Sequence, residues 1–269
     1  MIGVVACEAL YSEVERICPD ARIKYVPQEL HEFPTNVPLT ADIEERLRTA
    51  IDRLDSPDLD RIVVVYANHG GDVGDPRPVR TPVLLSRPED CVSLFLPGSD
   101  ATETGERKEF GTYYLTRGVI DCGVDSYKLY AAYRGRTDEL VAEFEEARKS
   151  HPDLRVTWAD GERFNAAVDR QRSLSEETVG RFFHEILQYY ERVELVDTGG
   201  LYEHHHEYAE TFRAFVERLS ADHGDEHRVE LSVTDGDVSR LEGLLDPAGS
   251  QSLRDDKHVD VYRPDGAID

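Results

Sequence analysis

The chain has 269 residues, which is long enough for one large or two modest domains whose cores need no disulfide or metal. Its 31 basic and 55 acidic residues give a formal net charge of −24, which argues against nucleic-acid binding as its main function. No apolar run approaches the roughly 18 residues of a membrane span, and the first ten residues lack the basic start of a signal peptide. We therefore expect a cytoplasmic protein that binds neither nucleic acid nor membranes.

The composition also indicates a salt-rich habitat and a reducing compartment. The sequence contains five lysines, and arginine supplies most of the positive charge, as is typical of halophilic proteins. In molar salt the Debye length is about 3 Å, so we interpret the acidic residues as a solvated surface and not as a cation store. The four cysteines, Cys7, Cys18, Cys91 and Cys122, are too few for a disulfide framework.

Short β-branched runs alternate with helical patterns along the chain, which predicts an α/β fold with mostly parallel sheets. In the first half we expect strands at 2–6, 22–26, 61–66 and 91–96, and helices at 9–17 and 41–54. In the second half we expect helices at 138–150 and 177–190, and strands at 192–196 and 228–233. A short strand-like run at 259–264 is expected to dock back onto the body.

The two halves of the sequence resemble each other. The segment 151–156 echoes 18–23 about 130 positions earlier, and glycine pairs follow the strands at 61–66 and 192–196. This order predicts two similar three-layer lobes, at 1–109 and 127–246, with a connector at 110–126, a tail at 247–269 and a cleft between the lobes. The alternative is that strand–glycine motifs recur in any α/β chain, because tight turns need glycine.

Thiols and imidazoles fall where a parallel sheet places its ligands, at the carboxyl ends of its strands. Cys7 and His69 end two predicted strands, His31 follows a third, and Cys91 begins a fourth. Sulfur and imidazole nitrogen suit Zn, Fe, Co or Ni, so Cys7, His31, His69 and Cys91 are the predicted metal ligands. The alternative is packing, since cysteine is often fully buried. We assign packing roles to Cys18 and Cys122.

The same rule selects residues for a small-molecule ligand. The candidates are Asn68, Gly70, Gly71, Gly98, Ser99, Thr112, Tyr113, Thr198, Gly199 and Gly200. The segment 109–116 has two interpretations: Thr112 caps a helix whose first turn faces the core, or the tyrosines form a lid or connector. No complete phosphate-binding loop is present.

Three consecutive histidines, at 204–206, open a predicted helix. Adjacent helical residues point in different directions, so the three cannot share one ion. We interpret them as a solvated helix start, and whether they face the cleft stays open.

Several motifs together resemble a known family. They are Gly3-Val4-Val5-Ala6-Cys7, Leu30-His31-Glu32-Phe33-Pro34, Tyr66-Ala67-Asn68-His69-Gly70-Gly71, Asp90-Cys91, Gly111-Thr112-Tyr113-Tyr114-Leu115-Thr116 and Tyr262-Arg263-Pro264-Asp265-Gly266. They resemble a domain-of-unknown-function family of archaea and anaerobic bacteria that is often encoded near corrinoid-dependent methyltransferases. The family typically has cysteine where this chain has His69, and histidine where it has Asp90. The resemblance implies a metal- or corrinoid-related accessory role, with a methyltransferase or corrinoid protein as partner.

Three hypotheses for the function follow. The first is a protein that binds a metal or a small-molecule cofactor at the cleft, in the service of methyl transfer. The second is a metal-free enzyme in which Cys7 is the nucleophile and His31 or His69 its base. The third is a non-catalytic ligand-binding or scaffold protein. Whether the chain is an enzyme stays open.

Overall fold

A computed structural model of the chain divides into two compact units. Unit 1 comprises Met1–Glu29, Pro38–Lys108 and Gly236–Asp269, and unit 2 comprises Leu30–Val37 and Glu109–Asp235. The structure describes residues 1–27, 31–32, 37–38, 40–66, 80–86, 88, 90–96, 109–158, 175–246 and 259–263, without the side chains of 31–42. Both units combine helices with mostly parallel strands, as the sequence predicts.

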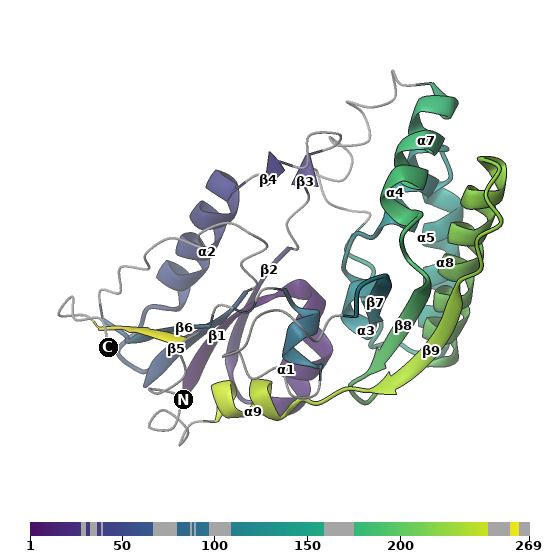
Figure 1. Cartoon of the computed structure of the whole chain (residues 1–269). Coiled ribbons are helices and arrows are strands. Elements are labelled where there is room, and N and C mark those ends of the chain that lie inside the picture. The colour runs from purple at the N-terminus through teal and green to yellow at the C-terminus, as the bar shows by residue number, and fades with distance from the viewer. Residues whose placement is uncertain are drawn as a thin grey trace. The chain divides into compact units, whose positions relative to one another are not determined.

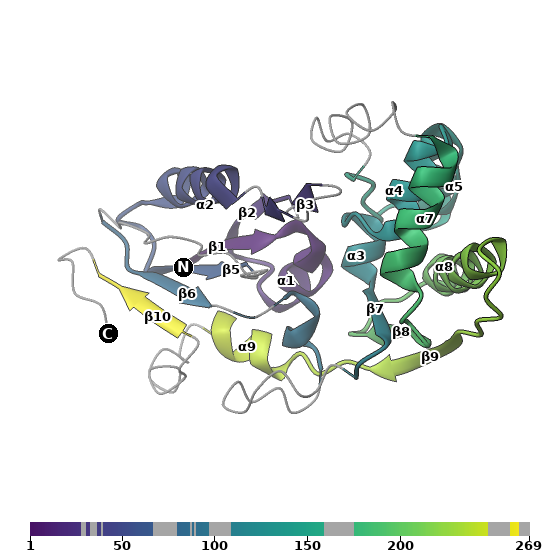
Figure 2. The ribbon, with the colours of Figure 1, turned by 45° about the horizontal axis from the view of Figure 1, so that its top comes forward.

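Unit 1 contains a five-stranded sheet (Figures 1 and 2). Its strands are β1 (Ile2–Cys7), β2 (Arg22–Val26), β5 (Arg61–Val65), β6 (Val83–Ser86) and β10 (Val259–Tyr262), in the order β10-β6-β5-β1-β2. The first four are parallel, and β10 pairs with β6 in the antiparallel sense, so the predicted docking of the tail is confirmed. Every residue of β1, β5 and β6 is buried, because a parallel sheet is covered on both faces.

Helices α1 and α2 cover opposite faces of that sheet. The helical elements of unit 1 are η1 (Glu8–Leu10), α1 (Tyr11–Ile17), α2 (Thr40–Leu54), η2 (Val92–Leu94) and α9 (Ser239–Leu245). A Cβ added to Gly3 would meet Leu54 at the end of α2, whereas Tyr25, in the alternate set of residues, bonds to the backbone of Tyr11 in α1. The short strands β3 (His31–Glu32) and β4 (Val37–Pro38) form a separate two-stranded sheet.

Unit 2 contains a three-stranded parallel sheet in the order β7-β8-β9. The strands are β7 (Thr112–Thr116), β8 (Arg192–Asp197) and β9 (Glu230–Asp235). The helices are α3 (Arg117–Asp121), α4 (Ser126–Tyr133), α5 (Thr137–Ser150), α7 (Glu176–Leu187) and α8 (Glu203–Asp222). Phe144, Phe183 and Phe212 lie fully buried in the core between these helices and the sheet.

Two predicted elements are wrong. The run Cys91–Leu96 contains the short helix η2 and no strand, because a short run with one β-branched residue, interrupted by Ser93, has no strong preference for either state. Thr112 does not cap a helix; it begins β7, in which Tyr113 and Tyr114 are aromatic strand formers. The similarity of two three-layer lobes and the cleft between them stay predictions.

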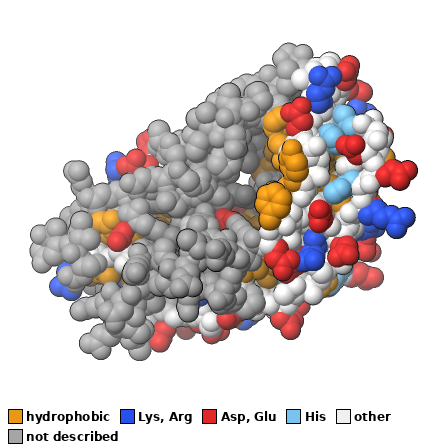
Figure 3. Space-filling model, in the orientation of Figure 1, with side chains coloured by type: hydrophobic (Ala, Val, Ile, Leu, Met, Phe, Trp, Pro, Cys, Tyr) orange, Lys and Arg blue, Asp and Glu red, His pale blue; other side chains and the backbone are white. Residues whose placement is uncertain are grey.

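Acidic side chains are visible on the described surface. On the face shown in Figure 3, Asp and Glu side chains are scattered over the described area and do not gather in one patch. This distribution agrees with a solvated acidic surface. None of the described helices is long and apolar enough to cross a membrane.

Candidate functional site

The strand order of unit 1 marks a ligand position at the carboxyl edge of its sheet. The chain runs from β1 to β2 on one side and then returns to β5 on the other, so the order reverses between β1 and β5. In open parallel sheets, ligands bind outside the carboxyl ends of the strands at such a reversal. Cys7 is the last residue of β1 and therefore lies at this point.

The two predicted thiol ligands are both buried in unit 1. Cys7 is 1% exposed and Cys91, five residues after the end of β6, is 7% exposed. Neither forms a disulfide. A catalytic thiolate needs access to its substrate, so this burial disfavours Cys7 as a nucleophile. It is compatible with a thiol ligand in a dry site.

The other residues predicted with Cys7 and Cys91 lie outside the described side chains, and His31 belongs to unit 2. His31 belongs to β3, but its side chain is not described, and His69 is not described at all. The same holds for Asn68, Gly70, Gly71, Gly98 and Ser99. Among the side chains that are described, no group of three or more His, Cys, Asp or Glu could hold a metal ion.

Cys18 and Cys122 have packing roles, in agreement with the prediction. Cys122 is 5% exposed in unit 2. Cys18 is half-buried, and its Sγ donates to the carbonyl oxygen of Leu245 over 3.7 Å. Burial raises the pKa of the Cys18 thiol, although the nearby Arg61 opposes the effect. This thiol is therefore protonated and unreactive near neutral pH.

In unit 2, the predicted ligand residues divide between core and surface. Thr112 is buried, and the ring of Tyr113 packs 4.4 Å from that of Phe212, so Tyr113 serves the core and not a lid. Thr198 is buried at the end of β8. Gly199 and Gly200 follow it, exposed and with φ of 91° and 108°, a conformation that favours glycine.

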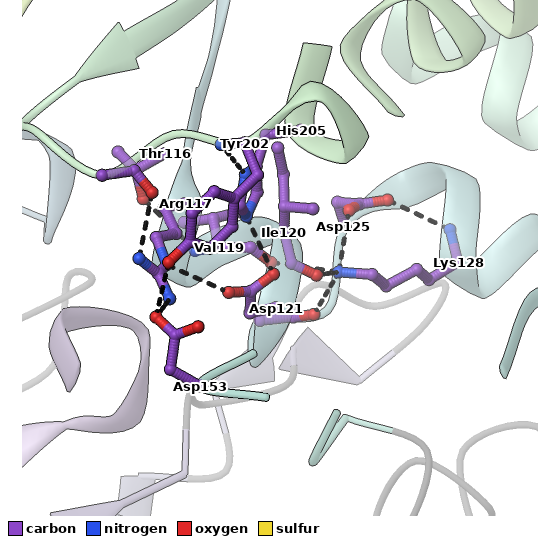
Figure 4. A network of polar contacts seen from close by, with 12 residues as sticks. Thr116, Arg117, Val119, Ile120, Asp121, Asp125, Lys128, Asp153, Tyr202 and His205 are labelled. Carbon is purple, nitrogen blue, oxygen red and sulfur yellow. Dashed lines mark hydrogen bonds and ion pairs between the residues drawn. The ribbon is translucent and has the colours of Figure 1, made fainter. Parts of the chain in front are cut away.

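Beside this glycine turn lies a buried arginine that bonds to three groups (Figure 4). The Nε of Arg117 donates to Asp121 over 3.4 Å, and its two terminal nitrogens donate to the carbonyl of Gly200 and to Asp153 over 2.9 and 2.8 Å. Partial burial alone would raise the pKa of Asp153, but its hydrogen bonds from Arg117 and Tyr202 lower it. The guanidinium therefore fixes the turn between β8 and α8.

Tyr202 and His205 fix the start of α8 in the same way. The Tyr202 hydroxyl donates to Asp153 over 2.7 Å, and the ring stacks on His151 with 3.8 Å between centroids. The backbone N–H of Tyr202 donates to His205 Nδ1 over 2.8 Å. The proton of the neutral ring therefore resides on Nε2, which donates to Asp121 over 3.1 Å. Both nitrogens of His205 are occupied, so this buried imidazole is structural.

A second buried ion pair, between Lys128 and Asp125, lies at the C-terminal end of α3. Lys128 is fully buried, and its Nζ donates to the carbonyls of Val119, Ile120 and Gly123 over 3.0, 2.6 and 2.8 Å. Asp125 lies 3.3 Å from the same nitrogen and also caps α4. Burial lowers the pKa of Lys128, and the charge of Asp125 opposes that effect. The ammonium thus satisfies carbonyls that the short helix leaves without partners.

The three consecutive histidines have different environments, because adjacent helical residues point in different directions. Their interpretation as a solvated helix start is wrong for His205, which is 0% exposed. His205 is buried, His206 is exposed and His204 is half-buried. The His204 ring packs edge-on against Phe144, 4.6 Å away, and its Nε2 has no hydrogen-bond partner among the described residues. Burial, with help from the neighbouring His205, lowers the pKa of His204 to about 4. His204 is therefore neutral at pH 7.

Sequence reasoning missed the network around Arg117 and Lys128. Its members come from β7, α3, α4 and α8, and their burial is not apparent in a sequence rich in surface charge. Two local signals were present. Arg117 and Asp121 are spaced i and i+4, and Asp125 stands at a helix start three residues before Lys128.

The fold and these sites define a mixed α/β protein with mostly parallel sheets. A family model described as "Protein of unknown function (DUF1638)" matches residues 25–245. Because this match covers more than half of the chain, the chain belongs to that family. No curated protein and no solved structure matches the chain.

Proposed function

We propose that unit 1 binds a transition metal ion at the carboxyl edge of its sheet, with thiol ligation by Cys7 and Cys91. The position of Cys7 at the strand-order reversal carries this proposal, because ligands in parallel sheets bind at that point. Two buried cysteines without a disulfide supply soft ligands that suit Zn, Fe, Co or Ni.

His69 is the histidine of the proposed ligand set in unit 1. His69 follows β5 by four positions, and β5 is the neighbour of β1 across the reversal. His31 belongs to β3 in unit 2, so its role as a ligand stays a prediction from the sequence. Imidazole nitrogen and thiolate sulfur are the usual ligands of tetrahedral metal sites. A link to corrinoid-dependent methyl transfer, and a methyltransferase or corrinoid protein as partner, stay predictions that rest on resemblance.

Metal analysis of protein purified without a histidine tag, in high salt and under reducing conditions, tests the proposal. We expect about one equivalent of metal, and less than about 0.2 equivalents in Cys7→Ser. Cys18→Ser is the matched control, since Cys18 already bonds to a backbone carbonyl, and it should retain the metal. Absence of any transition metal from native and reconstituted wild-type protein alike would refute the proposal.

The structure also bears on the second hypothesis, a Cys7 nucleophile. Selective alkylation of Cys7 in the folded, metal-free protein would support it, because a nucleophile must be accessible as thiolate. We expect slow alkylation, since Cys7 is 1% exposed.

A further inference from the structure

A buried tyrosine directly follows strand β5. The strand itself, Arg61–Val65, is buried throughout and consists of aliphatic residues after the arginine. Tyr66 is 1% exposed and is among the largest fully buried side chains in the described part of the chain. A buried tyrosine hydroxyl needs a hydrogen-bond partner, whereas phenylalanine would fill the space without one. The hydroxyl of Tyr66 therefore indicates a specific contact in addition to packing.

That contact is with the end of another strand of the same sheet. The Tyr66 hydroxyl donates to the carbonyl oxygen of Pro27 over 2.9 Å. Pro27 directly follows β2, and its ring fixes the backbone angle φ, so the acceptor belongs to a stiff part of the chain. The hydrogen bond thus joins the carboxyl ends of β5 and β2, between residues 39 positions apart in the sequence.

Strand β1 lies between the two strands that this bond joins (Figure 2). Neighbouring strands are about 4.8 Å apart, so β5 and β2 are separated by about 10 Å. The side chain of Tyr66 must therefore cross the carboxyl end of β1 to reach Pro27. Cys7 is the last residue of β1. The tyrosine thus covers the strand end that carries the thiol.

The strand register places the tyrosine and the thiol on one face of the sheet. Cys7 and Tyr66 directly follow Ala6 and Val65, which are cross-strand partners. Side chains alternate along a strand and in-register partners point to the same side, so Cys7 and Tyr66 share the opposite side. This side faces α2, since it also carries Gly3. The 1% exposure of Cys7 is consistent with this cover.

We propose that Tyr66 is the positioning residue of the Cys7 site, because its bond to Pro27 holds the aromatic side chain across the thiol and controls access to it. The bond also fixes the point from which the chain continues to His69, three residues later. This second role rests on the proposed function, in which Cys7 and His69 bind the metal, whereas the cover over Cys7 does not. Groups that orient metal ligands commonly strengthen metal binding.

Alkylation of the reduced, metal-free full chain in high salt tests the cover. Iodoacetamide is the reagent, and mass spectrometry resolves the rate at each cysteine. Tyr66→Phe retains the ring and loses the hydrogen bond, so Cys7 should react about fivefold faster, the change expected when one such bond no longer opposes local opening. Cys18, half-buried in unit 1 and bonded to the carbonyl of Leu245, should react at an unchanged rate.

Tyr25→Phe is the matched control. The Tyr25 hydroxyl also donates to a backbone carbonyl, that of Tyr11 over 3.4 Å, but on the α1 face of the same sheet. This variant should leave the alkylation rate of Cys7 unchanged. Circular dichroism confirms that both variants are folded. Equal rates at Cys7 in Tyr66→Phe and wild type, or equal acceleration of Cys7 and Cys18, would overturn the inference.

Competition for Co²⁺ against a chelator tests the second role. Tyr66→Phe should bind Co²⁺ about fivefold more weakly than wild type, since the same hydrogen bond is lost. It should retain the thiolate-to-cobalt charge-transfer band, because Cys7 remains a ligand, and Tyr25→Phe should match wild type. Unchanged affinity of Tyr66→Phe would refute the role in metal binding. A wild-type protein that binds no metal would refute the proposed function, and the alkylation rates would still decide whether Tyr66 covers Cys7.

Discussion

The two sheets end in chemically different carboxyl edges. In unit 1 the edge carries buried thiols and hydroxyls among apolar strands, and the Oγ atoms of Ser12 and Ser86 lack partners within the described chain. In unit 2 the edge carries full charges, but Arg117 and Lys128 bond to carboxylates and carbonyls of their own unit. A buried charge is stable only when it is paired, so the unit 2 network maintains structure. Buried polar atoms without a hydrogen-bond partner occur in both units, such as Ser86 Oγ in unit 1 and His204 Nε2 in unit 2, so the two edges differ in the charges they carry.

The largest expected effect on stability follows from removal of the buried ammonium group in unit 2. Lys128→Met should lower the free energy of unfolding by about 3 to 5 kcal/mol, because three carbonyls lose a donor and the buried Asp125 loses its counter-charge. The single tryptophan, Trp158, is buried in unit 2, so its fluorescence during denaturation in urea reports this loss. Lys149→Met is the control: its side chain is 71% exposed, and we expect a change below about 0.5 kcal/mol. Equal stability of the two variants would contradict a structural role for the network.

The second-largest loss of stability is expected for Asp121→Ala. It removes the acceptor of both Arg117 Nε and His205 Nε2, and the expected cost is about 2 to 3 kcal/mol by the same fluorescence measurement. Asp121→Asn retains an acceptor oxygen for His205 and should cost less. If both variants lose the same amount, the carboxylate acts through its charge and not through the bond to His205.

Cys7→Ala should have a smaller effect on the metal-free protein. The substitution removes one sulfur atom from a buried position, so we expect a loss of about 1 kcal/mol, measured by circular dichroism in urea. A loss as large as that of Lys128→Met would show that the thiol is structural. The contrast between the two sheet edges would then disappear.

The effect that is smallest at neutral pH appears only in acid. The pKa of His204 in the folded protein is about 4, below its ordinary value of 6.5, so the folded state binds fewer protons than the unfolded state. Its contribution to stability is present above pH 6.5 and is lost as the pH falls toward 4. His204→Phe should reduce the loss of stability over this window, whereas His206→Phe, at an exposed site, should not. Parallel pH profiles for wild type and His204→Phe would contradict the assignment.

The sequence predicts strands with a continuous β-branched run, such as β5, or with alternating apolar residues, such as β8, and helices with clear apolar periodicity, such as α5. It fails at β7, where Thr112 and Gly111 resemble a helix start, and at η2, where the apolar run is short. These failures share a cause: a few residues of local pattern cannot decide between states that tertiary packing determines.

Some features of the candidate sites could likewise be predicted from the sequence, and others appear only in the folded structure. The position of Cys7 follows from strand order and could be predicted, because the end of a strand is visible in the sequence. The bond from Tyr66 to Pro27 could not, since the two residues are 39 positions apart and meet only when the sheet is assembled. Likewise, Arg117 and His205 are 88 positions apart, and both bond to Asp121 only in the folded unit.

The route of the chain has a consequence for folding during synthesis. Nearly all of unit 2 is one continuous stretch, Glu109–Asp235, whereas the sheet of unit 1 needs β10, which is translated after unit 2. Unit 2 can therefore acquire its native structure on the ribosome while β6 still has an open edge. Until Val259–Tyr262 emerges, that edge is exposed to pairing with other chains, so the last strand protects the nascent protein from aggregation.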